Sequence, residues 1–273
     1  MRVIESFVAG KAGNPSLCED AVIVTQSHAA IVDGATDTTG QGYGVPAVPG
    51  GRWAMAACVE AITTLAEDAD VETATRHLTS TLAGRIDPAL RPHLRPSASV
   101  TVYSRRRRQV WQIGDVGFHY AGLAEGAGRP RKPLDRIAAD FRAAVIAAEL
   151  AIREAGELDL AVTDPGRIAA RALISRQGAL RNTVGPYAFA AIDGRPVPPS
   201  LVTVHDVPGH VDELVLASDG YPEIRPTLAE TEARLAELLA EDPHCIGPLR
   251  GTKGVMAGQI SFDDRSYLRL RLS

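Results

Sequence analysis

The grouping of strand-like and helix-like segments along the chain limits its fold class more than any other sequence feature. Short β-branched runs bounded by Gly, Pro, Asn and Ser predict strands at residues 3–8, 21–25, 29–32, 98–103, 109–113, 201–205, 213–217 and 266–272. Apolar residues recurring every three to four positions predict helices at residues 52–67, 71–82, 134–158, 167–174 and 228–239. Strands and helices thus come in groups, which favours an α+β fold with antiparallel sheets and outer helices over an alternating parallel sheet.

Length and hydrophobicity predict one globular domain. With 273 residues, of which 45% are hydrophobic, the chain can bury a substantial core. The breaker-rich pieces at 123–133 and 192–200 are too short to act as interdomain linkers, so we expect a single domain over residues 1–273. No run approaches the roughly 18–20 apolar residues of a membrane span, and the first residues lack the apolar core of a secretory signal. We therefore expect a cytoplasmic protein with no membrane partner.

Charge and cysteine content exclude several classes of function. The net charge of −4 argues against sequence-independent nucleic-acid binding, and the four arginines at 105–108 fit a solvated hairpin turn better than a nucleic-acid patch. The chain has 26 arginines but three lysines, a bias that by itself says little about function. Its three cysteines are far apart and form no CxxC pair, so neither a disulfide framework nor a thiolate zinc site is indicated.

Four aspartates share one sequence context. Asp33, Asp115, Asp219 and Asp263 each lie at the margin of an apolar run, and the first three have a glycine beside them. Carboxylates gathered in this way repel one another, and oxygen ligands without His or Cys partners indicate Mg²⁺ or Mn²⁺. For any one of the four, a turn or a helix cap is the simpler interpretation, because Asp-Gly is a common turn dipeptide. For the four together, a metal site is favoured because of the family resemblance described next.

In chain order these motifs resemble those of the metal-dependent serine/threonine protein phosphatases of type 2C, the PPM family. The matching elements are Cys18-Glu19-Asp20-Ala21, Val32-Asp33-Gly34, Gly114-Asp115-Val116-Gly117, Ala217-Ser218-Asp219-Gly220 and Asp263-Asp264-Arg265-Ser266. The resemblance runs from about residue 10 to the C-terminus. It implies a four-layer α/β/β/α sandwich, in which two antiparallel sheets are flanked by helices.

The resemblance also implies a set of metal ligands. They are Asp33, Gly34, Asp219, Asp263, Asp115, Glu19 and Asp20. Asp33 would bridge two Mn²⁺ or Mg²⁺ ions, the Gly34 carbonyl would bind one of them, and Asp219 and Asp263 would bind the other. Asp115 would hold a possible third ion, while Glu19 and Asp20 would support the site directly or through water.

The implied function is metal-dependent hydrolysis of phosphoserine or phosphothreonine in a protein or peptide. A water that bridges two divalent cations becomes a hydroxide near neutral pH and can attack phosphorus in line, so no protein nucleophile is required. One alternative is a phosphatase-fold binding or regulatory module that is weakly active or inactive. Another is the hydrolysis of a small-molecule phosphate.

The chain departs from the family at positions that contact the substrate. Pro15 stands where many members have an arginine that holds phosphate, and Ala35 follows Asp33-Gly34 where members usually have Met, Val or His. Lys11 and Arg52 are candidate substitutes for the arginine, but both are better interpreted as solvated surface charges. Substrate-binding residues are therefore not assigned from the sequence.

Overall fold

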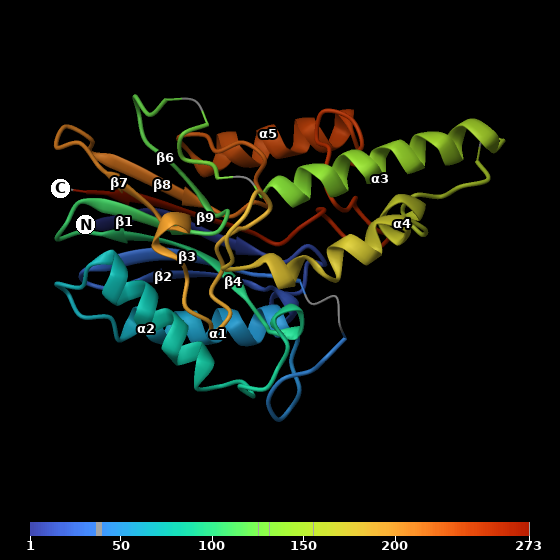
Figure 1. The fold of residues 1–273 in the computed structure, drawn as a ribbon. Coiled ribbons are helices and arrows are strands. Elements are labelled where there is room, and N and C mark those ends of the chain that lie inside the picture. The colour runs from blue at the N-terminus through green and yellow to red at the C-terminus, as the bar shows by residue number, and fades with distance from the viewer. Residues whose placement is uncertain (37–39, 125, 131, 155, 273) are drawn as a thin grey trace.

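The computed structural model describes every residue except 37–39, 125, 131, 155 and 273 (Figure 1). Its described part contains nine strands: β1 (Arg2–Ala9), β2 (Asp20–Val24), β3 (His28–Gly34), β4 (Ala98–Ser104), β5 (Gln109–Ile113), β6 (Gly117–His119), β7 (Thr203–Asp206), β8 (Glu213–Ala217) and β9 (Arg265–Arg271). The same part contains five α-helices: α1 (Gly50–Thr63), α2 (Val71–Ala83), α3 (Pro133–Ile152), α4 (Pro165–Ile174) and α5 (Leu228–Glu241).

Two antiparallel sheets form the centre of the molecule. One has the strand order β1-β9-β8-β6, and the other has the order β2-β3-β4-β5-β7. Successive side chains of a strand point to opposite faces, so β3 sends Ala29 and Ile31 into the core between the sheets and Ala30 and Val32 toward the helices. Leu216 of the other sheet belongs to the same inter-sheet core as Ile31. The strands are hydrophobic on both faces because both faces are covered.

Helices cover the two outer faces (Figure 1). Ile62 of α1 and Leu78 of α2 pack with Trp111 against the five-stranded sheet. Leu235 of α5 packs with Tyr267 of β9 on the outer face of the four-stranded sheet. The predicted α/β/β/α sandwich is therefore confirmed.

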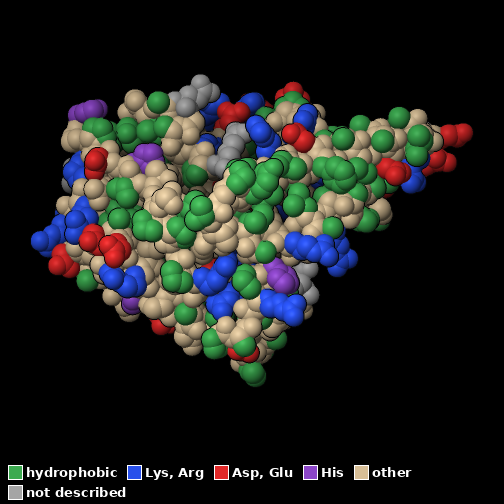
Figure 2. All heavy atoms as spheres, in the orientation of Figure 1, with side chains coloured by type: hydrophobic (Ala, Val, Ile, Leu, Met, Phe, Trp, Pro, Cys, Tyr) green, Lys and Arg blue, Asp and Glu red, His purple; other side chains and the backbone are tan. Residues whose placement is uncertain are grey.

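Helices α3 and α4 pack on each other and project beyond one end of the sheets (Figure 1). Figure 2 shows hydrophobic side chains gathered over this projection, among which Phe141, Leu150, Ile152 and Ile168 are exposed. Within the described residues, no helix has the length and hydrophobicity needed to cross a membrane.

The local predictions were mostly correct, with three differences. The hairpin across residues 104–108 is confirmed, since β4 and β5 pair antiparallel. The helix predicted over 134–158 ends at Ile152, because the backbone becomes extended at Arg153, with φ of −108° and ψ of 154°. The strand predicted over 201–205 is shifted, since Pro199–Leu201 forms a 3₁₀ turn before β7. Strand β6, of three residues, was not predicted at all.

Candidate functional site

Strand register brings the first predicted site residues together at one end of the five-stranded sheet. Asp20 of β2 lies opposite Asp33 of β3, and Asp33 lies opposite Ser99 of β4. Residues directly opposite each other in an antiparallel pair point to the same face of the sheet. The Ser99 hydroxyl donates a hydrogen bond to Asp115 Oδ1 at 2.5 Å, which adds the segment after β5 to this group.

The four-stranded sheet contributes the remaining predicted carboxylates. Asp219 follows β8, and Asp263 and Asp264 directly precede β9, which is the hydrogen-bonded neighbour of β8. Gly220 allows the two segments to approach closely, since a Cβ at this position would lie 2.0 Å from the Asp264 carbonyl oxygen. The Asp264 carboxylate then accepts a hydrogen bond from the Glu19 backbone N–H at 2.8 Å and so connects the two sheets.

Gly34 is also fixed by close packing. A Cβ there would lie 2.3 Å from the Gly51 carbonyl oxygen at the start of α1, and 2.9 Å from that of Glu19. The Gly34 N–H donates to the same Glu19 carbonyl at 3.0 Å. The structure therefore brings all seven predicted ligands to one end of the sandwich. We call the six carboxylates among them, together with Asp264, the acidic cluster.

Three members of the acidic cluster, Asp20, Asp33 and Asp219, form what we call the central carboxylates. Asp20 accepts a hydrogen bond from the Ser266 hydroxyl at 2.8 Å, yet burial and the charges of Asp263 and Asp219 raise its pKa to about 8. Burial and the charge of Asp219 also raise the pKa of Asp33. Burial and the charge of Asp263 raise the pKa of Asp219 to about 7. Among the described residues, no side chain forms an ion pair with Asp33 or Asp219, so neither carboxylate has a direct counter-charge. The charges of Lys253 and Lys132 act on Asp219, but its pKa stays raised.

The other four members, Glu19, Asp115, Asp263 and Asp264, are lysine-paired carboxylates. Lys132 Nζ lies 2.7 Å from Asp115 Oδ2, and Lys253 Nζ lies 2.6 Å from Asp263 Oδ2. Lys11 Nζ lies between 3.5 and 3.7 Å from Asp264, Asp263 and Glu19. Burial acts to raise the pKa of Asp115, but the charge and hydrogen bond of Lys132 outweigh it and the pKa is lowered.

These lysines correct the sequence interpretation. Lys11 was expected to be a solvated surface charge, but its side chain is 20% exposed and its ammonium group faces the acidic cluster. Lys132 and Lys253 were missed altogether. The one available signal was compositional, since lysine is rare in this arginine-rich chain.

Part of the acidic cluster fits a hard divalent cation. Among the described residues, no group of three or more His, Cys, Asp and Glu side chains is arranged to hold one ion. Proteins often hold Mg²⁺ with one or two carboxylates and several waters, and the uncompensated charge of Asp33 and Asp219 meets this requirement. Asp115 and Asp263 fit less well, because ammonium groups already contact them.

Two cavities border the acidic cluster. One of about 450 Å³ is lined by Asp115, Asp219 and Asp263, and its wall also carries Arg129, Arg136 and Arg250. The other, of about 80 Å³, shares Lys132 with the first and is lined on its far side by Arg181. The larger cavity is the size of a small-molecule pocket and opens onto the carboxylates.

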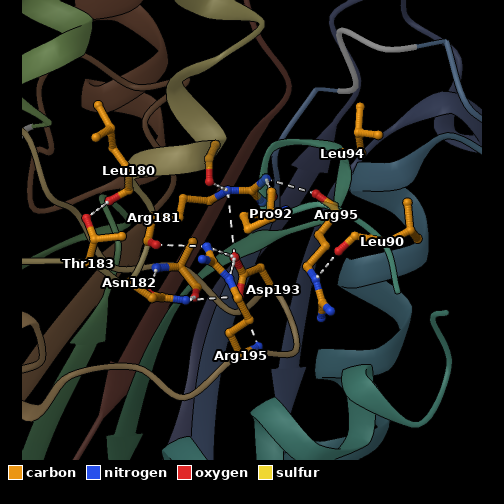
Figure 3. Close-up of polar contacts among 12 residues, drawn as sticks. Leu90, Pro92, Leu94, Arg95, Leu180, Arg181, Asn182, Thr183, Asp193 and Arg195 are labelled. Carbon is orange, nitrogen blue, oxygen red and sulfur yellow. Dashed lines mark hydrogen bonds and ion pairs between the residues drawn. The ribbon is translucent and has the colours of Figure 1, made fainter. Parts of the chain in front are cut away.

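The wall of the smaller cavity contains a second buried charge cluster, which we call the Asp193 cluster (Figure 3). Asp193 is fully buried and accepts hydrogen bonds from the Arg195 side chain at 2.6 and 3.1 Å and from Asn182 at 3.0 Å. Arg181 Nε lies 3.9 Å from Asp193, and its guanidinium also donates to the carbonyls of Pro92 and Arg95. This cluster holds loops together.

Comparisons with known proteins give structural matches only. No protein-family model matches the chain, and no curated protein matches it. The solved structures that match include the serine/threonine phosphatase PstP/Ppp of Mycobacterium tuberculosis, at 16% identity and a TM-score of 0.47, covering 97% of this chain and 96% of that one. They also include the serine/threonine phosphatase Stp1 of Staphylococcus aureus, at 11% identity and a TM-score of 0.49, covering 100% and 96%. RsbX in complex with magnesium matches at 13% identity and a TM-score of 0.46, covering 100% and 99%. The first two are serine/threonine phosphatases, the class of protein that the sequence motifs resemble.

Proposed function

We propose that the chain is a metal-dependent phosphomonoester hydrolase that acts on phosphoserine or phosphothreonine in a protein or peptide. One observation carries the proposal: Asp33 and Asp219 are carboxylates with raised pKa values and no ion-pair partner among the described residues, and Asp219 faces a cavity of about 450 Å³. Carboxylates kept in this state are typical of functional sites.

The chain's own residues would hold and orient the cation. Asp33 and Asp219 supply oxygen ligands from the two sheets, and Asp20 lies behind them, fixed by the hydroxyl of Ser266. A bound Mn²⁺ or Mg²⁺ would supply Lewis acidity, making a water more acidic and offsetting charge on phosphoryl oxygens. Because both sheets are rigid, the carboxylates need little rearrangement to hold the ion in place.

The cavity itself supports a phosphorylated ligand. Arg129, Arg136 and Arg250 line its wall and place positive charge along the approach to the carboxylates. Guanidinium groups are suited to phosphate oxygens. Arg129 donates to the carbonyls of Tyr221 and Pro222, and Arg250 pairs with Asp140, so Arg136 is the first candidate to replace the family arginine at Pro15.

Hydrolysis of an aryl phosphate and of a phosphothreonine peptide, each with and without Mn²⁺, tests the proposal. We expect Mn²⁺-dependent turnover that falls at least about 100-fold in Asp33→Asn and Asp219→Asn, because each substitution removes a charged ligand. Asp212→Asn, at an exposed position, is the matched control and should keep full activity. Turnover that is indifferent to a chelator would contradict the proposal.

A phosphate-binding module without turnover is a second candidate. It is favoured by the ammonium groups on Asp115 and Asp263, which leave fewer carboxylates open to metal than the family pattern has. In that case the phosphopeptide binds the chain in a calorimetric titration, while no phosphate is released at any Mn²⁺ concentration. Measurable turnover would remove this candidate.

A further inference from the structure

The three lysines of the chain share one location. Each places its ammonium group within 3.7 Å of a carboxylate of the acidic cluster, although arginine outnumbers lysine 26 to 3 in the sequence. Elsewhere in the described chain, the side-chain cations of the ion pairs are arginines, as in the Asp193 cluster. Ammonium is a compact point charge with rotatable donors, whereas guanidinium is a planar fork. Of the two cationic groups, ammonium is therefore closer to a metal ion in shape.

Each ammonium group is held in place by a separate part of the fold. Lys132 directly precedes α3, and its ammonium lies 5.4 Å from the ring centre of Phe189. Lys11 lies in the turn that follows β1, and its backbone N–H donates to Asp264 at 2.8 Å. Both lysines are therefore positioned by backbone or ring contacts as well as by their charge.

Lys253 is positioned by two arginines, of which Arg142 is buried and Arg167 is half-buried. Arg142 of α3 donates to the carbonyls of Cys245 and Gly251 at 2.8 and 3.2 Å, and Arg167 of α4 donates to the Thr252 carbonyl at 2.8 Å. These contacts fix the loop on which Lys253 lies. The 2.6 Å contact between Lys253 and Asp263 therefore belongs to the fold and does not depend on a freely moving side chain.

The lysines divide the acidic cluster by charge. They engage Glu19, Asp115, Asp263 and Asp264, and they leave Asp33 and Asp219 without an ion pair among the described residues. Any ion that approaches Asp263 or Asp115 has to displace an ammonium group and then remain beside it. At separations of about 4 Å, the repulsion between such charges is several kcal/mol near a protein surface.

We propose that Lys11, Lys132 and Lys253 are resident counter-ions that take the place of metal at Asp263 and Asp115. The site then binds one divalent cation, at Asp33 and Asp219, and Lys253 and Lys132 hold its affinity down. This inference rests on the proposed function only in that the same site binds a divalent cation. It explains why the three lysines of this arginine-rich chain all lie at the acidic cluster.

A titration of the purified chain with Mn²⁺ alone, followed by calorimetry and by the electron paramagnetic resonance signal of free Mn²⁺, measures the number of bound ions directly. We expect one ion per wild-type chain. Lys253→Met and Lys132→Met each open a carboxylate and remove a repelling charge, so we expect a second bound ion or an affinity at least about tenfold tighter. Arg76→Met, which removes one cation from an exposed pair on α2, is the control and should change neither.

The double variant Lys253→Met/Asp263→Asn keeps the measurement valid if Lys253→Met alone folds poorly, because it removes both charges of one pair. We expect it to fold and to bind one ion. Two or more ions on the wild-type chain, with affinities unchanged in the lysine variants, would overturn the inference, as would a wild-type chain that binds no Mn²⁺. One bound ion without any phosphate release supports the inference and removes the proposed function. Release of phosphate by a chain with two bound ions supports the proposed function and removes the inference.

Discussion

The acidic cluster and the Asp193 cluster bury carboxylates in opposite ways. Asp193 is fully buried, and arginine and asparagine donors occupy its oxygens at 2.6 to 3.1 Å (Figure 3). Asp33 and Asp219 are half-buried, and the charges that raise their pKa values are those of neighbouring carboxylates. The carboxylate of the Asp193 cluster is already occupied by cationic side chains, whereas Asp33 and Asp219 of the acidic cluster can still bind a cation.

This difference distinguishes a structural charge from a functional one. Burying a carboxylate is unfavourable unless a partner compensates it, so a compensated carboxylate can stabilise a fold while an uncompensated one is retained for another reason. Asp115 and Asp263 are intermediate, because each contacts an ammonium and still lines the larger cavity. The same substitution should therefore have opposite effects on stability in the two clusters.

Asp193→Asn should have the largest effect on stability. It keeps the shape of the side chain but leaves the guanidinium groups of Arg195 and Arg181 without their counter-charge. Removing one partner of a buried ion pair destabilises a protein by about 3–5 kcal/mol. Urea unfolding with and without Mn²⁺ measures this loss, and the loss should be the same in both conditions. A variant as stable as the wild type would show that the Asp193 cluster is not structural.

Arg142→Lys tests a second fully compensated pair and should have a somewhat smaller effect. Arg142 donates to Asp164 at 2.7 Å and to the carbonyls of His244, Cys245 and Gly251, so it joins α3 to α4 and to the loop of Lys253. Lysine keeps the charge but cannot reach these acceptors together, which should lower the free energy of unfolding by about 2–3 kcal/mol.

A structural role for Arg142 also has a second readout. If the loop of Lys253 loosens, the number or affinity of bound Mn²⁺ ions should change in Arg142→Lys as it does in Lys253→Met. Arg250→Lys, at an exposed pair with Asp140, is the matched control for stability. Equal stability of the two variants would contradict the comparison.

The sequence predicted the parts of the site that depend on local pattern. Asp33 and Asp219 end hydrophobic strands, and Asp263 lies just before one, so their placement at sheet margins follows from strand periodicity alone. The prediction that they converge depended on the family resemblance, because register between distant strands is not written in either strand.

The cations of the site could not be predicted in the same way. Lys11 meets Asp264 across 253 positions of sequence, and Arg142 meets Cys245 across 103. No periodicity relates such residues, and an isolated lysine in a polar segment is most simply a solvated charge. Lys132 and Lys253 lie closer in sequence to their partners, Asp115 and Asp263. Irregular segments separate each pair, however, so the sequence does not determine where the lysine side chains point.

The dependence of stability on pH should also separate the two kinds of carboxylate. Burial raises the pKa of Asp20 to about 8 and that of Asp219 to about 7, while an unperturbed carboxyl has a pKa near 3.9. Between about pH 4 and pH 8 the folded, metal-free chain thus binds more protons than the unfolded chain, so its stability falls as the pH rises. The carboxylate of Asp115 has the opposite effect, because Lys132 lowers its pKa. Its ionised form stabilises the fold, and this stabilisation is lost only as the pH falls into the more acidic range.

Urea unfolding of the metal-free chain at pH 5 and at pH 8 measures this effect. We expect a loss on the order of 2 kcal/mol at pH 8 relative to pH 5. Saturating Mn²⁺ at pH 8 should reverse the loss, because a cation favours the ionised carboxylates. Stability that rises from pH 5 to pH 8 without metal would contradict the assignment of the central carboxylates.

Asp33→Asn completes the comparison and should have the smallest effect on stability, with the opposite sign to Asp193→Asn. Removing one negative charge relieves repulsion by Asp219 and Asp20, so at pH 8 the metal-free variant should be more stable than the wild type by about 1 kcal/mol. The same variant should lose Mn²⁺ binding in the calorimetric titration, which a purely structural aspartate would not do. Because the pKa of Asp33 is raised, protonation removes the same charge as the pH falls, so the gain should be smaller at pH 5 than at pH 8. A loss of stability at both pH values would place Asp33 with Asp193 among the structural carboxylates, and the functional site would then need a different centre.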